Sequence, residues 1–256
     1  AWYRDGLALE ELGRHREAVA SFDRAIAASP KAIGAWYGKG RSLQALGRGR
    51  DSLQALEKGL AIEPANPEDW FSRGLILEDL GRYQEAVPSL EKALRANPNH
   101  ARAWFHLGLS LAGGGDDTGA VEAFSRVLEA EPENCPALYH RGLALMETRR
   151  YLEAAGSLEK ALALSPSADA WYQLGIARER LGKFGEAVEA LDKAIGMDPD
   201  KPLAWCFRGV ALAKSGDHAG AVSALDRTLA LNPADGEAWH RKGLALQALG
   251  RPDEAW

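Results

Sequence analysis

Cysteine is scarce in this sequence, which has only Cys135 and Cys206 among its 256 residues. Small secreted domains that depend on disulfides carry several pairs of cysteines, so a disulfide scaffold is excluded. The two cysteines lie far apart in the sequence and no secretion signal precedes them, which favours free thiols over a disulfide. We therefore expect a protein of a reducing compartment, with the cytoplasm as its location.

Long hydrophobic runs and an excess of one charge are also absent. No apolar run approaches the roughly 18 residues that cross a membrane, and the opening "AWYRDGLALEELGR" lacks the basic-then-apolar layout of a signal peptide. The 31 basic and 36 acidic residues give a formal net charge of -5, which gives no reason to expect nucleic-acid binding. The sequence predicts neither a membrane nor a nucleic-acid partner. Because it begins without Met, one residue before a tryptophan, we expect a fragment of a longer protein.

What the sequence does contain is a repeat of about 34 residues, each copy opening on a large side chain, usually tryptophan. We call this opening residue the mark of its repeat. The marks are Trp2, Trp36, Trp70, Trp104, Leu138, Trp171, Trp205 and Trp239. Their spacing is constant, except that the interval from Leu138 to Trp171 is one residue shorter than the others. The chain therefore holds seven repeats and part of an eighth.

The residues inside each repeat predict a pair of antiparallel helices. Trp36, Gly40 and Leu43 share one face of a first helix, and the glycine lets a second helix approach closely. Gly47 suits the left-handed conformation that ends a helix, and a proline blocks the second helix at its far end. Trp104 is expected in the core, opposite Ala120 and Phe124 of the second helix. One such pair cannot bury its own apolar face, so the pairs must stack.

This pattern resembles the tetratricopeptide repeat family, whose Trp-x-x-Leu-Gly-x-x-Tyr, Ala-x-x-x-Phe and Pro positions recur along the whole chain. The resemblance implies an all-α fold, a right-handed α-solenoid of stacked antiparallel helix pairs forming a single domain over 1–256. The expected repeats are approximately 1–32, 33–66, 67–100, 101–134, 135–167, 168–201, 202–235 and a partial 236–256.

Several residues depart from the family pattern. Leu138 replaces the tryptophan of the fifth repeat, and Ser52 and Gly59 weaken the second helix of the second repeat. Basic residues stand three positions after the mark in five repeats, where the family usually has Leu. These residues are Lys39, Arg73, Arg141, Arg208 and Lys242.

No constellation for catalysis or metal binding emerges from the sequence. A nucleophile elbow, a zincin motif and a dinucleotide fingerprint are all missing, and no Gly-Lys-Ser/Thr follows the glycines of "LAGGGDDTGA". His106 and His140 occupy equivalent positions of adjacent repeats, but no Cys, Asp or Glu completes a metal site beside them. Cys206 and His240 sit on neighbouring first helices, whose axes lie about 8–10 Å apart, too far for a nucleophile and base. We expect no enzyme, no catalytic residue, no cofactor and no metal.

The resemblance implies that the first helices line a concave groove in which partner peptides or helices lie. An aromatic row and a nearly continuous apolar row on these helices are predicted to form the binding surface. The candidate partner-binding residues are Tyr37, Arg41, Phe71, Leu75, Phe105, His106, Leu109, Tyr139, His140, Leu143, Tyr172, Gln173 and Ile176.

Three functions remain open from the sequence. The first is a non-catalytic protein-interaction scaffold that binds a mostly apolar peptide or helix of a partner of unknown identity. The second is a recognition or regulatory arm of a larger enzyme or signalling protein. The third is a self-assembling structural repeat. Because the chain stops early in the eighth repeat, Trp239, Leu246, Leu249 and Trp256 are expected to be exposed and to promote self-association.

Overall fold

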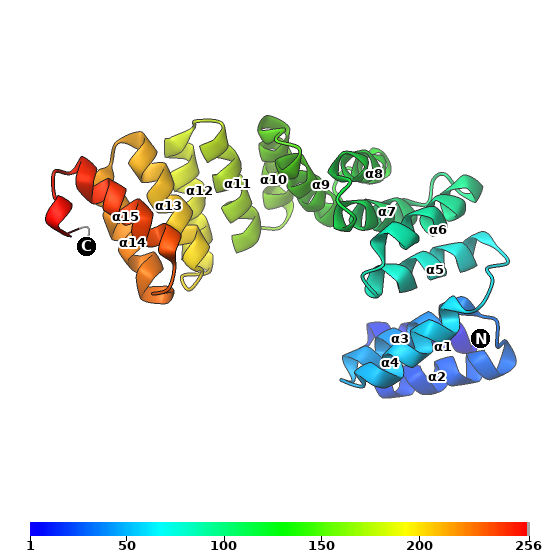
Figure 1. Ribbon diagram of the computed structural model, residues 1–256. Coiled ribbons are helices and arrows are strands. Elements are labelled where there is room, and N and C mark those ends of the chain that lie inside the picture. Colours follow the sequence, from blue (N-terminus) through cyan, green and yellow to red (C-terminus); the bar gives the residue numbers. More distant parts are fainter. Residues whose placement is uncertain (255–256) are drawn as a thin grey trace. The chain divides into compact units, whose positions relative to one another are not determined.

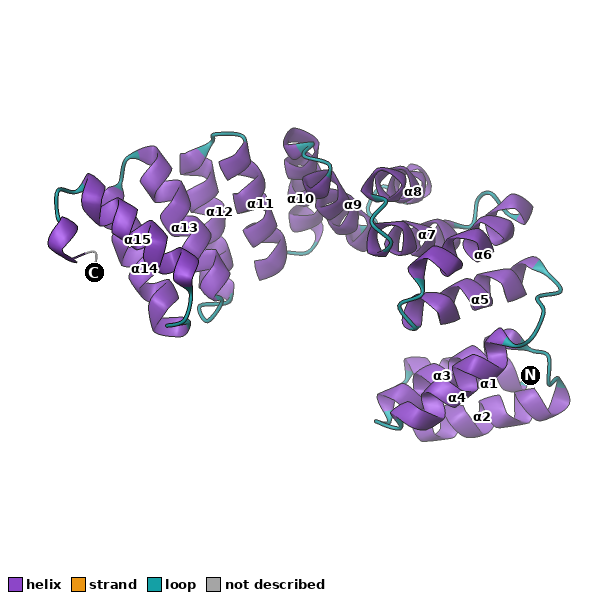
Figure 2. Ribbon diagram, viewed as in Figure 1, coloured by secondary structure: helices purple, strands orange, loops and turns teal. Residues whose placement is uncertain are grey.

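The computed structural model describes residues 1–254, and every regular element in that range is helical (Figures 1 and 2). The helices come in antiparallel pairs, as predicted. The first helices are α1 (Trp2–Glu11), α3 (Ile33–Ala45), α5 (Pro67–Asp79), α7 (Ala101–Gly113), α9 (Cys135–Glu147), α11 (Ala168–Arg180), α13 (Pro202–Ser215) and α15 (Gly236–Ala248). The second helices are α2 (His15–Ala28), α4 (Gly49–Leu60), α6 (Tyr83–Ala96), α8 (Asp117–Ala130), α10 (Tyr151–Leu164), α12 (Phe184–Met197) and α14 (His218–Leu231). The short 3-10 helix η1 (Pro252–Glu254) follows α15.

The chain divides into two compact units, which are described separately. Unit 1 comprises Ala1–Ala130 with helices α1 to α8, and unit 2 begins at Glu131 and carries α9 to α15. Inside each unit, each helix packs against the next along the chain. None of the helices in residues 1–254 combines the length and the apolar character that crossing a membrane requires.

Each helix pair is held together where a large apolar side chain of the second helix meets a glycine of the first. Phe124 of α8 is fully buried against Gly108 of α7, where an added Cβ atom would come within 2.7 Å of the phenyl ring. Leu158 of α10 packs against Gly142 of α9 in the same way. The predicted close approach of the two helices is therefore confirmed. It brings the second helix onto the backbone of the first, which gives the core its high packing density.

The second repeat differs from the others, as its sequence predicts. Helix α4 has 12 residues, whereas the other second helices have 14, and the hydroxyl of the buried Ser52 donates to the carbonyl of Gly40 at 2.8 Å. An added Cβ at Gly59 would lie 2.8 Å from the side chain of Ile76 on α5. Helix α5 accordingly packs against both α3 and α4, and Ile33, Leu56 and Ile76 form the buried cluster at this junction.

The predicted core position of Trp104 is only partly right. Ala120 and Phe124 are fully buried, but Trp104 is half-buried, and its indole N–H donates to the carbonyl of Pro98 at 2.7 Å. One side of the indole packs against the core of unit 1, while its edges border two open cavities. The tryptophan therefore has surface that a ligand can reach.

The exposure predicted for the last repeat is wrong for one residue. Leu246 is only 2% exposed, because its helix α15 packs against α14 and is also contacted by η1, which follows it in the chain. Trp239 is 50% exposed, as expected. Leu249 is half-buried. Trp256 lies outside the described residues. The exposed leucine of α15 is Leu244, at 53%.

The turn between the two helices of a pair uses a residue with positive φ at one fixed position, eleven residues after the mark. Seven repeats place glycine there, for example Gly47 with φ 73° and Gly182 with φ 76°. The fifth repeat places Arg149 there, with φ 59°, the single non-glycine residue of positive φ in the described chain. Its amide donates to the carbonyl of Met146 at 3.0 Å, as the amide of Gly182 does to Glu179. The turn geometry is retained at the cost of backbone strain.

Replacing Arg149 with glycine should stabilise unit 2. The left-handed conformation costs an L-residue about 1–2 kcal/mol, which the substitution would remove. Glycine also has more conformational freedom in the unfolded chain, which offsets part of this gain, so the free energy of unfolding should rise by about 0.5–1 kcal/mol. Urea unfolding followed by circular dichroism measures the change. Gly182→Ala is the matched control and should lose about 1 kcal/mol. A destabilised Arg149→Gly variant would contradict the strain.

Candidate partner-binding surfaces

The residues predicted to contact a partner lie on α3, α5 and α7 of unit 1 and on α9 and α11 of unit 2. We call the surface formed by the odd-numbered helices of a unit its first-helix face. Most of the predicted residues are exposed or half-buried on these faces. They are Tyr37, Arg41, Phe105, His106, Leu109, Tyr139, His140, Leu143, Gln173 and Ile176.

Three of the predicted residues are buried, so their expected exposure is wrong. Phe71, Leu75 and Tyr172 are 3%, 5% and 8% exposed. The next first helix along the chain covers each aromatic ring. The ring centroid of His100, which caps α7, lies 4.8 Å from that of Phe71, and the centroid of Phe207 on α13 lies 5.7 Å from that of Tyr172. These side chains join neighbouring repeats and are not available to a partner.

The first-helix face of unit 1 carries a polar network that its own helices complete. Arg41 Nε lies 3.4 Å from the carboxylate of Glu10, which links α3 to α1, and the guanidinium lies 5.7 Å from the ring centroid of Tyr37. Tyr37 in turn shares a hydrogen bond with Asp79 at the end of α5. Burial raises the pKa of the Tyr37 hydroxyl well above its usual range, so it stays protonated.

A second set of contacts crosses from α5 to α7. His106 Nδ1 lies 3.2 Å from both carboxylate oxygens of Glu78, and the hydroxyl of Ser110 donates to the same group at 3.3 Å. The ring of His106 also stands edge-on to Phe71, with centroids 5.9 Å apart. Because these polar groups are paired within the chain, the first-helix face of unit 1 offers few unpaired groups to a partner peptide.

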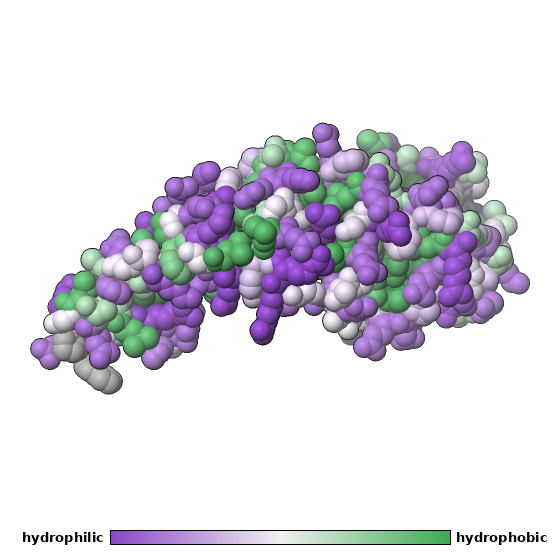
Figure 3. Space-filling model, turned by 90° about the horizontal axis from the view of Figure 1, so that it is seen from above, coloured by the Kyte–Doolittle hydropathy of each residue, from purple (hydrophilic) through white to green (hydrophobic). Residues whose placement is uncertain are grey.

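The first-helix face of unit 2 is more apolar. Residues five positions after the mark form a row across four successive first helices, and only Val210 among them is buried. The row consists of Leu143, Ile176, Val210 and Leu244. Tyr139, His140 and Gln173 lie beside it on α9 and α11 and are half-buried. In the view of Figure 3, hydrophobic surface occurs as separate patches among hydrophilic side chains.

An open cavity of about 200 Å³ lies at the end of this row, between α13, α14 and α15. Val210, Leu225 and Leu244 supply its apolar lining, while Lys214 and Arg241 stand among its polar residues. Lys214 donates to Glu179, which is 3% exposed, and Arg241 pairs with Glu237 at 2.7 Å. The cavity has room for an apolar side chain and has two cations beside it.

The Cys206 thiol lacks the lowered pKa of a reactive cysteine. Burial raises the pKa of the Cys206 thiol, with Arg241 acting in the opposite direction, whereas a reactive cysteine needs a lowered pKa. Cys135 and Cys206 are both free thiols. Within residues 1–254, no three His, Cys, Asp or Glu side chains are grouped so that they could hold a metal ion.

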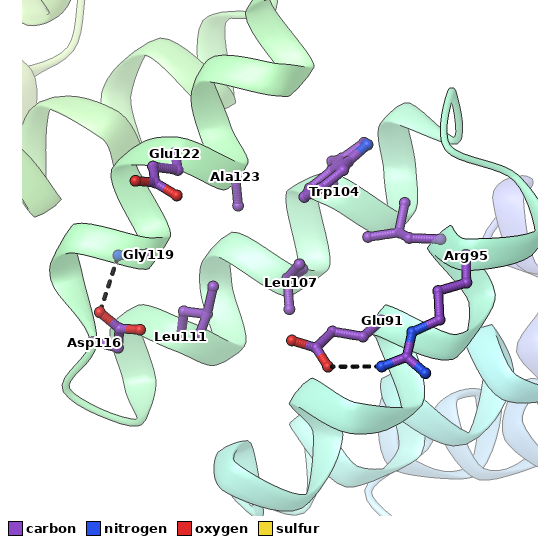
Figure 4. A pocket seen from close by; sticks show the side chains of 10 residues that line it. Glu91, Arg95, Trp104, Leu107, Leu111, Asp116, Gly119, Glu122 and Ala123 are labelled. Carbon is purple, nitrogen blue, oxygen red and sulfur yellow. Dashed lines mark hydrogen bonds and ion pairs between the residues drawn. The ribbon is translucent and has the colours of Figure 1, made fainter.

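The sequence did not reveal a cavity of unit 1 that lies between α6 and α8 and has α7 as its floor (Figure 4). Its volume is about 520 Å³, and Trp104 and Leu107 form part of its wall. A signal was present in the sequence: Leu107 stands three residues after the mark, where five other repeats have a basic residue. The family usually has leucine at this position, so comparison with the family does not single out Leu107. Only comparison with the other repeats of this chain does.

Comparison with known proteins gives a consistent result. The tetratricopeptide repeat family matches residues 9–72, 71–134, 139–202 and 208–255. None of the curated proteins matches the chain in sequence.

Solved structures supply related folds. A crystal structure of MamA is 31% identical, covering 58% of this chain and 88% of its own, with a TM-score of 0.56. MamA from Desulfovibrio magneticus RS-1 is 26% identical, covering 66% and 97%, with a TM-score of 0.63. YrrB, described as a tetratricopeptide repeat protein with an unusual peptide-binding site, is 22% identical, covering 74% and 98%, with a TM-score of 0.65.

The polar network of unit 1 predicts a pH dependence of stability through Glu10. Burial raises the pKa of this carboxyl above its ordinary value, against the opposing effect of Arg41. The folded chain therefore holds the proton more tightly than the unfolded chain, so protonation of Glu10 stabilises unit 1. This contribution is complete below the unfolded pKa of about 4.5 and is lost as the pH rises through the folded pKa.

Glu10→Gln, which cannot titrate, should remove this contribution. The free energy of unfolding of the variant minus that of the wild type should be largest at neutral pH. This difference should decrease as the pH falls through the folded pKa of Glu10. Urea midpoints measured for both proteins from neutral to mildly acidic pH test this. A difference between the two midpoints that does not change with pH would show that Glu10 titrates as an ordinary carboxyl.

Proposed function

Since the chain belongs to the tetratricopeptide repeat family, we propose that it is a non-catalytic protein-interaction scaffold that binds a peptide or helix of a partner on its first-helix face. The observation that carries the proposal is the apolar row of unit 2, Leu143, Ile176, Val210 and Leu244, which ends at the cavity between α13, α14 and α15. Exposed apolar surface of this kind is stabilised when a partner covers it.

The row favours a mostly apolar segment. One apolar side chain of the segment would occupy the cavity beside Val210 and Leu244, and the rest of the segment would follow the row toward α11 and α9. Tyr139, His140 and Gln173 flank that path and would contact the segment's backbone and polar groups. Lys214 and Arg241 also stand at the cavity, but both already pair with carboxylates of the chain, Glu179 and Glu237, so the apolar lining is what favours the segment.

Unit 1 has a smaller part in this proposal. Tyr37, Arg41 and His106 are engaged in contacts with Asp79, Glu10 and Glu78, so a partner would have to replace those contacts. Phe105 and Leu109 on α7 are half-buried and remain candidate contacts. We therefore place the principal binding surface on unit 2.

Leu244→Glu should abolish binding at this surface. Peptides selected from a random library on the wild-type chain serve as probes, and their affinity is measured by fluorescence anisotropy. A charge in place of an apolar anchor should weaken binding by at least about tenfold, as for other central interface residues. Leu203→Glu is the matched control, because Leu203 is 52% exposed on the neighbouring first helix α13 but does not line the cavity.

Equal affinity of the Leu244→Glu and Leu203→Glu variants would contradict the proposal. Light scattering of the wild type gives a further check. If Leu244→Glu dissociates a complex between copies of the chain, the surface serves self-association and not a foreign peptide.

A further inference from the structure

The groove of unit 1 between α6 and α8 has a composition that the proposed function does not use. Leu94 of α6, Leu107 and Leu111 of α7 and Ala123 of α8 form its apolar lining. Acidic side chains stand around this lining, namely Glu91, Asp116 and Glu122, with Arg95 as the basic one. Figure 4 shows Glu91 and Arg95 on one side of the groove and Asp116, Gly119 and Glu122 on the other, with Trp104 at one end.

The equivalent place is occupied by the chain's own lysine in the second and eighth repeats and by Arg208, paired with Asp192, in the seventh. In the second repeat, Lys39 Nζ lies 2.6 Å from Asp23 and 5.7 Å from the ring centroid of Trp36. In the eighth, Lys242 Nζ lies 2.6 Å from Asp226 and 5.2 Å from the ring centroid of Trp239. Each ammonium group therefore lies between a carboxylate of the preceding second helix and the tryptophan of its own repeat, a favourable position for a cation.

The fourth repeat keeps the carboxylate and the tryptophan but lacks the lysine. Glu91 precedes Trp104 by the same interval as Asp23 precedes Trp36, and Leu107 takes the place of Lys39. The ion pair that Glu91 makes is with Arg95, at 4.0 Å, and the Arg95 side chain is 77% exposed. Such a distant, exposed pair contributes little energy and is readily exchanged.

The indole of Trp104 also lacks a cation that other repeats supply. A lysine or arginine of the same repeat's second helix stacks on the indole of Trp2, Trp36, Trp70 and Trp171. The equivalent residue of the fourth repeat, Arg126, pairs instead with Glu129 at 3.0 Å. Among the described residues, no cation lies over the ring of Trp104. A second cavity, of about 500 Å³, lies on the other side of the indole, between Pro98 and Arg126.

We propose that the groove between α6 and α8 binds a lysine-containing, otherwise apolar segment of a partner protein. The partner's ammonium group lies between the carboxylate of Glu91 and the indole of Trp104, where the chain's own lysine lies in the second and eighth repeats. Apolar neighbours of that lysine cover Leu94, Leu107 and Leu111. Lysine is chosen because Lys39 and Lys242 each lie near both a carboxylate and an indole. Arg208, at the equivalent place in the seventh repeat, pairs with Asp192 at 2.6 Å.

A variant that supplies the missing cation gives the sharpest test. Leu107→Lys should place an ammonium group against Glu91 and Trp104, as Lys39 does, and so fill the subsite from within. Leu107→Met is the matched control, because it keeps the site apolar and open. Glu91→Gln removes the carboxylate without touching the apolar lining, and it keeps the test decisive if Leu107→Lys fails to fold.

The probe is a short acetylated and amidated peptide of leucine and lysine at helical spacing, with a second peptide in which glutamine replaces every lysine. Fluorescence anisotropy of the labelled peptides should show that the wild type and Leu107→Met bind the lysine peptide with similar affinity. Leu107→Lys, Glu91→Gln and the glutamine peptide should each lose about tenfold, the size expected for a partly desolvated cation beside a carboxylate and an indole. Circular dichroism confirms that each variant is folded.

Several results would overturn the proposal. The wild type fails to bind the lysine peptide, or binds the glutamine peptide equally well, or a folded Leu107→Lys or Glu91→Gln variant binds as the wild type does. Light scattering that shows a complex between copies, dissociated by Leu107→Lys, would make a second copy the occupant. Leu203→Glu, the unit 2 control that lines neither cavity, should leave the peptide's affinity unchanged. The proposed function is tested at Leu244 with library-selected peptides, so a failure of one proposal is distinguishable from a failure of the other.

Discussion

Contact between a large apolar side chain of each second helix and a glycine of the first is the constraint on which the structure depends. At Gly108 and Phe124 there is no room for even one added carbon atom, so the two helices cannot rotate or slide past each other without losing this contact. Fixing the pair in this way also fixes which positions of the first helix point outward. Three members of the apolar row of unit 2 directly follow the glycines that make this contact, Gly142, Gly175 and Gly209.

Much of the fold follows from local patterns, and the sequence therefore predicted it well. The helix pairs, the close approach at glycine and the turn at Gly47 each depend on residues within one repeat. Burial on the first-helix face is different. Phe71 is covered by His100 at the N-terminal end of α7 and by His106 of α7, and Tyr172 by Phe207 of α13. Those contacts depend on which side chain each neighbour happens to carry, and the repeat pattern does not specify it.

The candidate sites were harder to predict for the same reason. Arg41 and His106 were predicted to face a partner, and the structure places both against acidic groups of neighbouring first helices, Glu10 and Glu78. A list of polar residues on one helix face cannot show which of them are already paired. The surfaces that remain are those where pairing is incomplete or apolar, such as the row ending at Leu244 and the groove beside Trp104.

A repeat protein can create a binding site where one repeat carries a different kind of residue at a position that is charged in its neighbours. The pairs Lys39–Asp23 and Lys242–Asp226 are partly exposed, and such pairs contribute only about 0–1 kcal/mol each. Leucine in place of lysine in the fourth repeat therefore gives up little ionic energy, and Leu107, which is 5% exposed, buries apolar area. What differs is the groove: its carboxylate and indole are present without a cation between them. The same geometry that stabilises the second and eighth repeats is thereby left open, in the fourth, to a cation from outside the chain.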